Sequence, residues 1–186
     1  MKGNEAVVAL IESLEALGIH YMVTGSYASN VHGVPRSTMD ADFIIEAPPE
    51  EVDRLLDGLK PPLRPASQML FETVTSSHRW MVRVDRSAFT LELFLLNNHP
   101  FDRSRFDRRT REEVLPGIMS WLPTAEDVIV QKLRWSVRAK RPKDFKDACE
   151  VISVQRNRLD WPYIEQWCAE LEASAALAEA RSIAEG

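Results

Sequence analysis

Cysteine and long apolar runs are what this sequence has least of. Only two cysteines occur, Cys149 and Cys168, each among apolar and acidic residues that favour helix. A disulfide framework is therefore not expected, and two buried thiols in a reducing compartment are the simpler interpretation. Near the start, the longest uncharged apolar run covers residues 6–11 and is closed by Glu12, far short of a membrane span. Because no small-residue cleavage site accompanies it, we expect a cytoplasmic protein with no membrane partner.

The sequence patterns of several common enzyme classes are also missing. There is no Gly-x-Ser-x-Gly elbow of the kind that carries a nucleophilic serine, and no Walker loop. The histidines are too scattered to indicate a zinc site; they are His20, His32, His78 and His99. Serine hydrolases, P-loop enzymes and zinc enzymes are therefore poor matches to this chain.

The composition is that of a globular protein, and its charge is unevenly distributed. With 186 residues, of which 45% are hydrophobic and 27% charged, the chain is long enough for one domain and an appendage. The net charge of −5 combines −5 in residues 1–98, +5 in residues 99–146 and −5 in residues 147–186. The basic middle segment has two explanations, a solvated helical surface or a surface for an anionic ligand.

Hydrophobic periodicity predicts an alternation of helices and strands in the first part of the chain. Apolar residues recur at helical spacing from Val7 to Leu17, and Gly18 suits the end of that helix. The other expected elements are strands at 19–23, 39–45, 81–84 and 89–96, a short helix at 26–32, a helix at about 50–59 and a tight turn at 85–87. Together they predict a mixed sheet of about four or five strands.

From Thr124 onward the pattern is helical. Thr124 suits an N-cap, and the expected helices cover about 125–139, 142–155 and a stretch that opens at Trp161. The alanine-rich stretch 173–184 is a further helix or a frayed tail. The expected fold class is α/β (α+β), with a mixed sheet flanked by helices in a domain at residues 1–122 and a helical subdomain at residues 123–186.

Two aspartates stand within one of the expected strands. Since side chains alternate along a strand, Asp40 and Asp42 point to one face, and their apolar neighbours point to the other. Two carboxylates held this close repel each other, so the arrangement is costly unless a cation neutralises it. Hard oxygen ligands suit Mg²⁺ or Mn²⁺. Asp-x-Asp alone is weak evidence, because short motifs match by chance.

Gly25 and Ser26 follow the preceding strand and provide a second indication. Here glycine lets a phosphate approach the backbone, the helix that follows offers free N–H groups, and Ser26 adds a hydroxyl donor. A strand-to-helix turn capped by serine is the plainer explanation. Thirteen residues separate the pair from Asp40, enough for a short helix and a return. Phosphate donors and carboxylates are therefore expected to meet at one edge of neighbouring strands.

A third carboxylate and an arginine complete the candidate site. Glu92 alone interrupts an apolar strand, so it needs a wet edge or a counter-charge, and a partly buried salt bridge is the plain alternative. Arg36, just before the aspartates, either pairs with Glu92 or grips a triphosphate with its planar guanidinium. We prefer the triphosphate, because Arg36 lies in the same loop as the glycine–serine turn.

These residues resemble the motifs of the DNA polymerase β-like nucleotidyltransferase superfamily. The resemblance spans about residues 19–94, and its matching stretches are Val23-Thr24-Gly25-Ser26, Asp40-Ala41-Asp42 and Leu91-Glu92-Leu93. The sequence is most similar to bacterial AbiEii-type and related toxin nucleotidyltransferases, because Arg36-Ser37-Thr38 precedes the acids and residues 126–132 and 141–147 also look alike. Glu92 stands where aspartate is usual, which leaves Asp85 as a reserve candidate for the third acid.

The resemblance implies a nucleotidyltransferase-type sheet and a two-metal transfer of a nucleotidyl group from an NTP, with pyrophosphate leaving. The metal ligands, for Mg²⁺ or Mn²⁺, would be Asp40, Asp42 and Glu92, and the nucleotide-binding residues Gly25, Ser26, Arg36 and Lys132. The acceptor is left open. It is an RNA or protein hydroxyl, with an antitoxin-type protein as a partner, or a small molecule such as an aminoglycoside. A non-catalytic nucleotide-binding or partner-binding module is the third alternative.

Lys132 has two open roles. It lies in the middle of an expected helix, where it either meets a phosphate or forms a salt bridge with Asp144 that ties two helices together. Asp144 and Asp147 share a helix face, because they are three residues apart.

Overall fold

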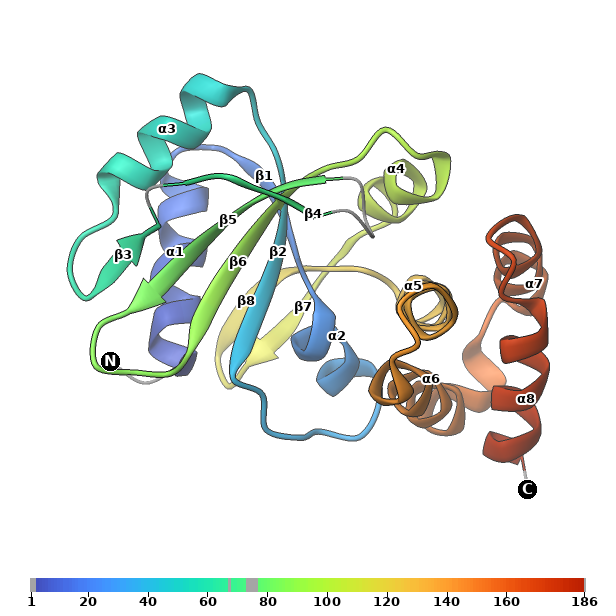
Figure 1. Ribbon diagram of the computed structural model, residues 1–186. Coiled ribbons are helices and arrows are strands. Elements are labelled where there is room, and N and C mark those ends of the chain that lie inside the picture. Colours follow the sequence, from blue (N-terminus) through green and yellow to red (C-terminus); the bar gives the residue numbers. More distant parts are fainter. Residues whose placement is uncertain (1–2, 67, 73–76, 186) are drawn as a thin grey trace. The chain divides into compact units, whose positions relative to one another are not determined.

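The chain folds into two compact units. The computed structural model describes residues 3–66, 68–72 and 77–185, and Figure 1 shows its helices and strands. One unit, which we call the sheet unit, comprises Met1–Tyr27 and Ser37–Leu122. The other, the helical unit, comprises Ala28–Arg36 and Pro123–Gly186.

The sheet unit is built on a mixed sheet. Its strands are β1 His20–Thr24, β2 Asp40–Glu46, β3 Leu63–Pro65, β4 Leu70–Glu72, β5 Ser77–Val84 and β6 Thr90–Leu95. They follow the order β1-β2-β6-β5-β3, with β4 also paired to β5. Among the strand pairs of the described residues, only β2 and β6 run parallel to each other. The expected α/β fold class is confirmed, but the sheet has six strands in the described residues rather than four or five.

The two extra strands, β3 and β4, are each three residues long. Recognition of a strand from sequence needs about four to eight residues of alternating pattern, so strands this short carry no usable signal. They form because β5 is eight residues long and offers both of them an antiparallel partner.

Helices and a hairpin complete the sheet unit. The helices are α1 Gly3–Ala16, α3 Pro49–Gly58 and α4 Pro100–Asp107, and the hairpin consists of β7 Thr110–Leu115 and β8 Ile118–Leu122. The sequence predicted α1 and α3 but neither α4 nor the hairpin. Half of the residues of α4 and of β7 are charged, and β7 buries only Val114. The hairpin is fixed by tertiary contacts instead, including a 3.1 Å hydrogen bond from the buried Ser120 hydroxyl to the Tyr21 hydroxyl of β1.

The two faces of the sheet differ in character. On one face lie alternate residues of β2 and β6 that are at most 1% exposed: Ala41, Phe43, Leu91 and Leu93. Helix α1 contacts β1, β6 and α3 (Figure 1). On the opposite face, Met22 and Ile44 pack with Phe106 of α4. Further along that same face, β2 and β6 carry acidic residues, so this face is apolar at one end and acidic at the other.

The helical unit contains the helices that the sequence predicted in this part of the chain. They are α5 Ala125–Arg138, α6 Pro142–Gln155 and α7 Trp161–Glu170, followed by α8 Ser174–Glu185, with a short 3-10 helix at Arg156–Arg158. The Thr124 side chain caps α5 by accepting from the Asp127 backbone N–H at 3.4 Å. The alanine-rich end forms α8 rather than a frayed tail.

Residues 28–36 also belong to the helical unit, although the sequence pattern placed them in the first domain. They include the end of α2, which spans Gly25–His32. The imidazole Nε2 of His32 lies 2.8 Å from the Pro123 carbonyl, and Gln155 donates to the His32 carbonyl at 2.8 Å. These contacts join residues more than ninety positions apart, which no local pattern reveals.

Both cysteines are free thiols, but only Cys168 is buried as the sequence suggested for both. Cys168 is fully buried, and burial raises its pKa to about 12, whereas Cys149 is partly exposed. None of the helices in the described part of the chain combines the length and the hydrophobicity that a bilayer crossing requires.

Candidate active site

The acidic end of the sheet brings together three of the predicted carboxylates. Asp42 on β2 is directly opposite Thr24 on β1 and Glu92 on β6. Neighbouring strands lie about 4.8 Å apart, and residues in register share a face, so Asp42 and Glu92 are adjacent. Asp40 is two residues before Asp42 on the same strand and faces the same side.

Gly25 lies directly against the Asp42 carboxylate. Its φ is +60°, and a Cβ added there would lie 1.9 Å from the Asp42 Oδ2 atom. Any other residue would therefore be strained and would displace the carboxylate. Helix α2 begins at this glycine, so the positive end of the helix is next to the negative Asp42 side chain. The glycine–serine turn and the acid pair thus meet, as the spacing predicts, and Ser26 is 5% exposed.

Two hydroxyl groups lie near Asp40. The Thr38 hydroxyl donates to the Asp40 Oδ1 atom at 2.5 Å. The Tyr27 hydroxyl donates to the Asn4 Oδ1 atom at 2.8 Å. Burial raises the pKa of Tyr27, and the negative charge of Asp40 raises it further. The sequence analysis did not single out Tyr27. Its position two residues after Gly25 was the available signal, because it places Tyr27 in the first turn of α2, near the strand ends that carry the acid pair.

Glu92 has a cationic partner that the sequence analysis also missed. Arg79 on β5 donates from Nη1 to the Glu92 Oε2 atom at 2.7 Å, and the two side chains are 25% and 17% exposed. The reserve acid, Asp85, lies beyond the end of β5 and pairs with the exposed Arg64 at 2.7 Å. Strand register therefore favours Glu92 over Asp85 as the third acid of this site.

Two of the three acids could act together as ligands of a divalent cation. In residues 3–66, 68–72 and 77–185, no group of three or more His, Cys, Asp or Glu side chains is arranged to hold a metal ion. Mg²⁺ does not require such a group, because in nucleotide enzymes one or two carboxylates commonly hold it together with substrate phosphates and water. Asp40 and Asp42, on one face of β2, match this pattern, while Glu92 is bonded to Arg79.

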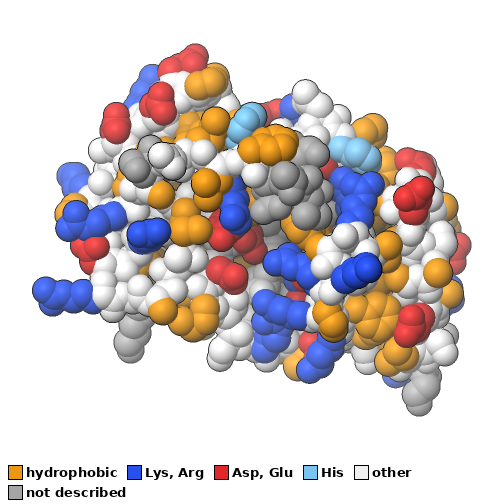
Figure 2. All heavy atoms as spheres, viewed as in Figure 1, with side chains coloured by type: hydrophobic (Ala, Val, Ile, Leu, Met, Phe, Trp, Pro, Cys, Tyr) orange, Lys and Arg blue, Asp and Glu red, His pale blue; other side chains and the backbone are white. Residues whose placement is uncertain are grey.

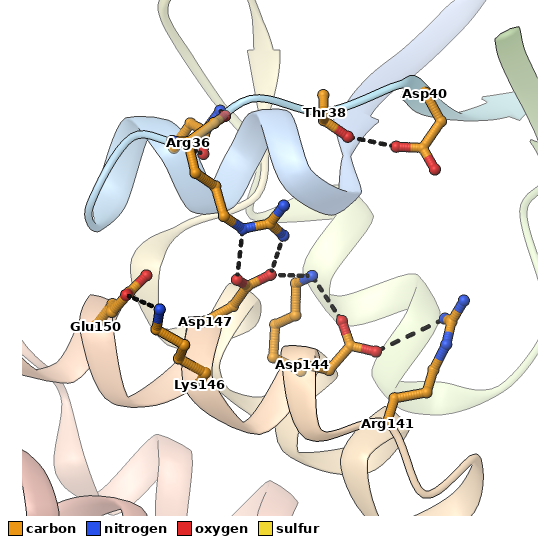
Figure 3. A network of polar contacts seen from close by, with 10 residues as sticks. Arg36, Thr38, Asp40, Arg141, Asp144, Lys146, Asp147 and Glu150 are labelled. Atoms are coloured by element: carbon orange, nitrogen blue, oxygen red, sulfur yellow. Dashed lines mark hydrogen bonds and ion pairs between the residues drawn. The ribbon is translucent and has the colours of Figure 1, made fainter. Parts of the chain in front are cut away.

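Arg36 and Lys132, the two predicted nucleotide-binding cations, belong to an ion-pair network inside the helical unit. Arg36 donates to both carboxylate oxygens of Asp147, at 3.0 and 2.9 Å (Figure 3). Lys132 donates to Asp147 at 2.7 Å and to Asp144 at 2.8 Å. Arg141 lies 3.6 Å from the other oxygen of Asp144. The salt bridge between Lys132 and Asp144, one of the two roles left open by the sequence, is present.

The charges in this network compensate each other. Burial alone would raise the pKa of Asp147, but hydrogen bonds from Arg36 and Lys132 outweigh it and lower the pKa below its ordinary value. Asp147 is 2% exposed and Lys132 is 7% exposed. These cations and carboxylates form a clamp between the helices, because the removal of one partner would leave an uncompensated buried charge.

The basic segment 99–146 does not form one surface. Several of its arginines are committed to acids within the sheet unit: Arg103 pairs with Glu46, Arg105 with the buried Asp102, and Arg111 with Glu15. Figure 2 shows Lys and Arg side chains in blue and Asp and Glu side chains in red on one face of the protein. Four exposed cations of the helical unit lie close together in sequence at the turn between α5 and α6, and they are Arg138, Lys140, Arg141 and Lys143.

Solved structures share this fold, although no family model and no curated protein matches the sequence. The antibiotic-resistance factor ANT(2'')-Ia, solved in complex with adenylyl-2''-tobramycin, aligns with a TM-score of 0.61 at 10% identity, over 92% of this chain and 97% of that one. JHP933 from Helicobacter pylori aligns with a TM-score of 0.51 at 14% identity, over 98% of this chain and 92% of that one. A proposed nucleotidyltransferase from H. pylori aligns equally well, at 13% identity.

One of these neighbours is described as a nucleotidyltransferase by proposal and another was solved with an adenylylated product, and this chain shares their fold. At identities of 10 to 14%, the similarity concerns the fold alone. It covers nearly the whole chain, including the helical unit, and not only the stretch that carries the sequence motifs.

Proposed function

We propose that the protein is a metal-dependent nucleotidyltransferase that moves a nucleoside monophosphate from an NTP to a hydroxyl acceptor. The observation that carries the proposal is the contact between the glycine–serine turn and the acid pair. Gly25 leaves room for the Asp42 carboxylate, and Glu92 lies opposite Asp42 in the sheet. A triphosphate at the start of α2 would therefore lie beside carboxylates that can share a cation with it.

The candidate site residues of the sheet unit have distinct tasks in this proposal. The backbone at Gly25 lets the β- and γ-phosphates approach, and the N–H groups at the start of α2 together with the Ser26 hydroxyl would hydrogen-bond to them. Asp40 and Asp42 would hold Mg²⁺ or Mn²⁺. The bound ions would neutralise the triphosphate and lower the pKa of the acceptor hydroxyl.

The reaction is a substitution at the α-phosphorus. A bond forms between the acceptor oxygen and the α-phosphorus, the bond from that phosphorus to the bridging oxygen breaks, and pyrophosphate leaves with the electron pair. The acceptor proton needs a base, and we assign to Glu92 the role of taking it or of serving a second ion. Arg36 and Lys132 have no required role, because their contacts with Asp147 and Asp144 support the ion-pair alternative.

For the acceptor, we propose a hydroxyl on RNA or protein, as the resemblance to toxin nucleotidyltransferases implies, with an antitoxin-type protein as partner. A small molecule is the second candidate. It is favoured by the similarity to ANT(2'')-Ia, whose solved complex contains an adenylylated tobramycin. Both candidates use the same donor half-reaction, so they differ only in what receives the nucleotide.

The test is to incubate the protein and Mg²⁺ with each of the four α-labelled NTPs and one acceptor class at a time. The acceptors are total cell RNA, cell protein and tobramycin. Label transferred to one class, together with stoichiometric pyrophosphate, is the expected result. A protein that binds an NTP but releases no pyrophosphate with any acceptor would be the non-catalytic binding module instead.

A further inference from the structure

The contact between Arg79 and Glu92 stands out on the acidic face, because it joins a cation to a residue that the proposed reaction needs. Arg79 pairs across the sheet with Phe94, and Glu92 pairs with Met81, so the two charged side chains are diagonal neighbours on adjacent strands. The guanidinium carbon lies 6.0 Å from the centre of the Phe94 ring. The arginine is therefore held from two sides, by a carboxylate and by an aromatic face.

Without a counter-ion, this part of the sheet would be unfavourable. Asp42 and Glu92 are directly opposite each other on parallel strands, and like charges in that position destabilise a sheet. A divalent cation would relieve the repulsion, and a guanidinium bonded to Glu92 relieves it as well. Arg79 thus brings a positive charge to the place where the two acids would otherwise repel each other.

We propose that Arg79 is the resting counter-ion of the acidic face and that it competes with a divalent cation for Glu92. The inference deepens the proposed function and rests on it, since it assigns a positioning residue to the same site. While Arg79 holds Glu92, the cation is limited to Asp40 and Asp42. When Arg79 releases the carboxylate, Glu92 becomes available as a base or as a further ligand.

Two features of the structure support a contact that can open. The Arg79 and Glu92 side chains are partly exposed, at 25% and 17%, so water can solvate both groups once they separate. The ion pairs of the helical unit are more enclosed, with side-chain exposures of 9% for Lys132 and 2% for Asp147. A pair at the wetter position costs less to open, because the separated charges are not left in an apolar interior.

The main test measures binding of Mn²⁺ alone, by titration calorimetry, without nucleotide. Arg79→Met keeps an unbranched side chain and removes the charge, and we expect it to bind Mn²⁺ at least about tenfold more tightly than wild type. The matched control is Arg64→Met, which removes an arginine–carboxylate pair of the same 2.7 Å length elsewhere in the sheet unit. The control is expected to bind Mn²⁺ as wild type does.

A double-mutant cycle with Glu92→Gln separates competition from a general effect of charge. In the Glu92→Gln background, Arg79→Met is expected to leave Mn²⁺ affinity unchanged, because the contested carboxylate is gone. An equal gain in both backgrounds would overturn the inference, since the arginine would then act only through its field. Arg79→Lys, which keeps a cation, is expected to restore an affinity close to that of wild type.

Failure of the inference can be told from failure of the proposed function. If Asp42→Asn abolishes Mn²⁺ binding but Arg79→Met does not change it, the metal site stands and the role of Arg79 is wrong. If Asp42→Asn leaves Mn²⁺ binding intact, or if no variant binds Mn²⁺, both proposals are contradicted. Thermal unfolding gives a second readout: Mn²⁺ is expected to raise the melting temperature of Arg79→Met more than that of wild type.

Discussion

Each unit of this protein carries a pair of aspartates close together in sequence, and the two pairs differ in what surrounds them. Asp144 and Asp147, on helix α6, are bonded to Lys132 and Arg36 inside the helical unit. Asp40, on strand β2, accepts a hydrogen bond from the Thr38 hydroxyl. Within the described residues it takes part in no ion pair.

The comparison shows why two similar motifs lead to different interpretations. In the helical unit, cations of the same unit compensate both carboxylates, so the aspartate pair there forms a structural clamp between helices. The carboxylates of the sheet unit instead adjoin a helix N-terminus, a hydroxyl and another carboxylate, and it is here that we propose a bound cation. The same residue type is thus structural in one unit and a candidate ligand in the other.

The largest effect is expected from the strand aspartates. Asp40→Asn or Asp42→Asn should reduce nucleotidyl transfer by about a thousandfold or more, because each removes a ligand of the cation on which the reaction depends. The apo protein should be as stable as wild type or more stable, since repulsion is relieved. Turnover with α-labelled NTP and the melting temperature are the measurements. Asp53→Asn, on the exposed side of α3, is the control, and wild-type turnover in either test variant would contradict the site assignment.

The helical clamp should respond in the opposite way, with a loss of stability. Lys132→Met leaves two buried carboxylates short of a cation, and we expect urea denaturation to show a loss of about 3 kcal/mol. The control is Lys146→Met, whose exposed ion pair with Glu150 spans 3.5 Å, and which should change stability by less than about 0.5 kcal/mol. If Lys132→Met is as stable as wild type but binds NTP poorly, the phosphate role is the correct one.

Glu92→Gln should come next, with a loss of activity of about a hundredfold, typical for a neutralised base or metal ligand. Asp85→Asn should be close to silent, because Asp85 is outside the strand register of the acid pair and is bonded to Arg64. Single-turnover transfer rates with both variants decide between the two acids. The reverse pattern would move the third acid to Asp85.

The pH dependence of stability provides a second test of the helical clamp, with a smaller expected effect. Burial raises the pKa of Asp147, but the hydrogen bonds from Arg36 and Lys132 outweigh burial and hold the pKa below its ordinary value of 3.8. A lowered pKa contributes stability that is complete above pH 3.8 and is lost as the pH falls below it. We therefore expect wild type to lose stability more steeply than Asp147→Asn between pH 5 and pH 2, as urea midpoints would show. Parallel profiles would mean that other acids control acid unfolding.

The smallest effect concerns the exposed cations at the turn between α5 and α6. If the acceptor is RNA, Arg138→Glu with Lys140→Glu should weaken RNA binding and flatten its logarithmic dependence on salt by about 0.7 per lost contact. NTP binding should hardly change. Arg158→Glu, an exposed arginine of the 3-10 helix, is the control. Equal losses for NTP and RNA would place the cluster on the nucleotide, and no loss would make it a solvated helix surface.

The sequence predicted the elements whose pattern is long and regular. Helix α6 was expected at 142–155 and spans Pro142–Gln155, since proline opens it and its apolar residues keep helical spacing. Strand β2 was expected at 39–45 and spans Asp40–Glu46. Helix α4 and the hairpin β7–β8 were missed because charged residues interrupt the apolar pattern of α4 and β7, and the hairpin is ordered by contacts with distant parts of the chain.

What the sequence by itself determined is which residues of the sheet unit make up the candidate site. A glycine–serine turn, two aspartates at a period of two and an isolated glutamate in an apolar strand define the candidate site through local rules alone. Only the tertiary structure decided which charges meet. It paired Arg36 with Asp147 across 111 positions, joined Lys132 to Asp144 and Asp147, and placed Arg79 on Glu92. The reason is physical, because ion pairs between segments depend on strand register and helix packing, and neither is written in the spacing of the residues that form them.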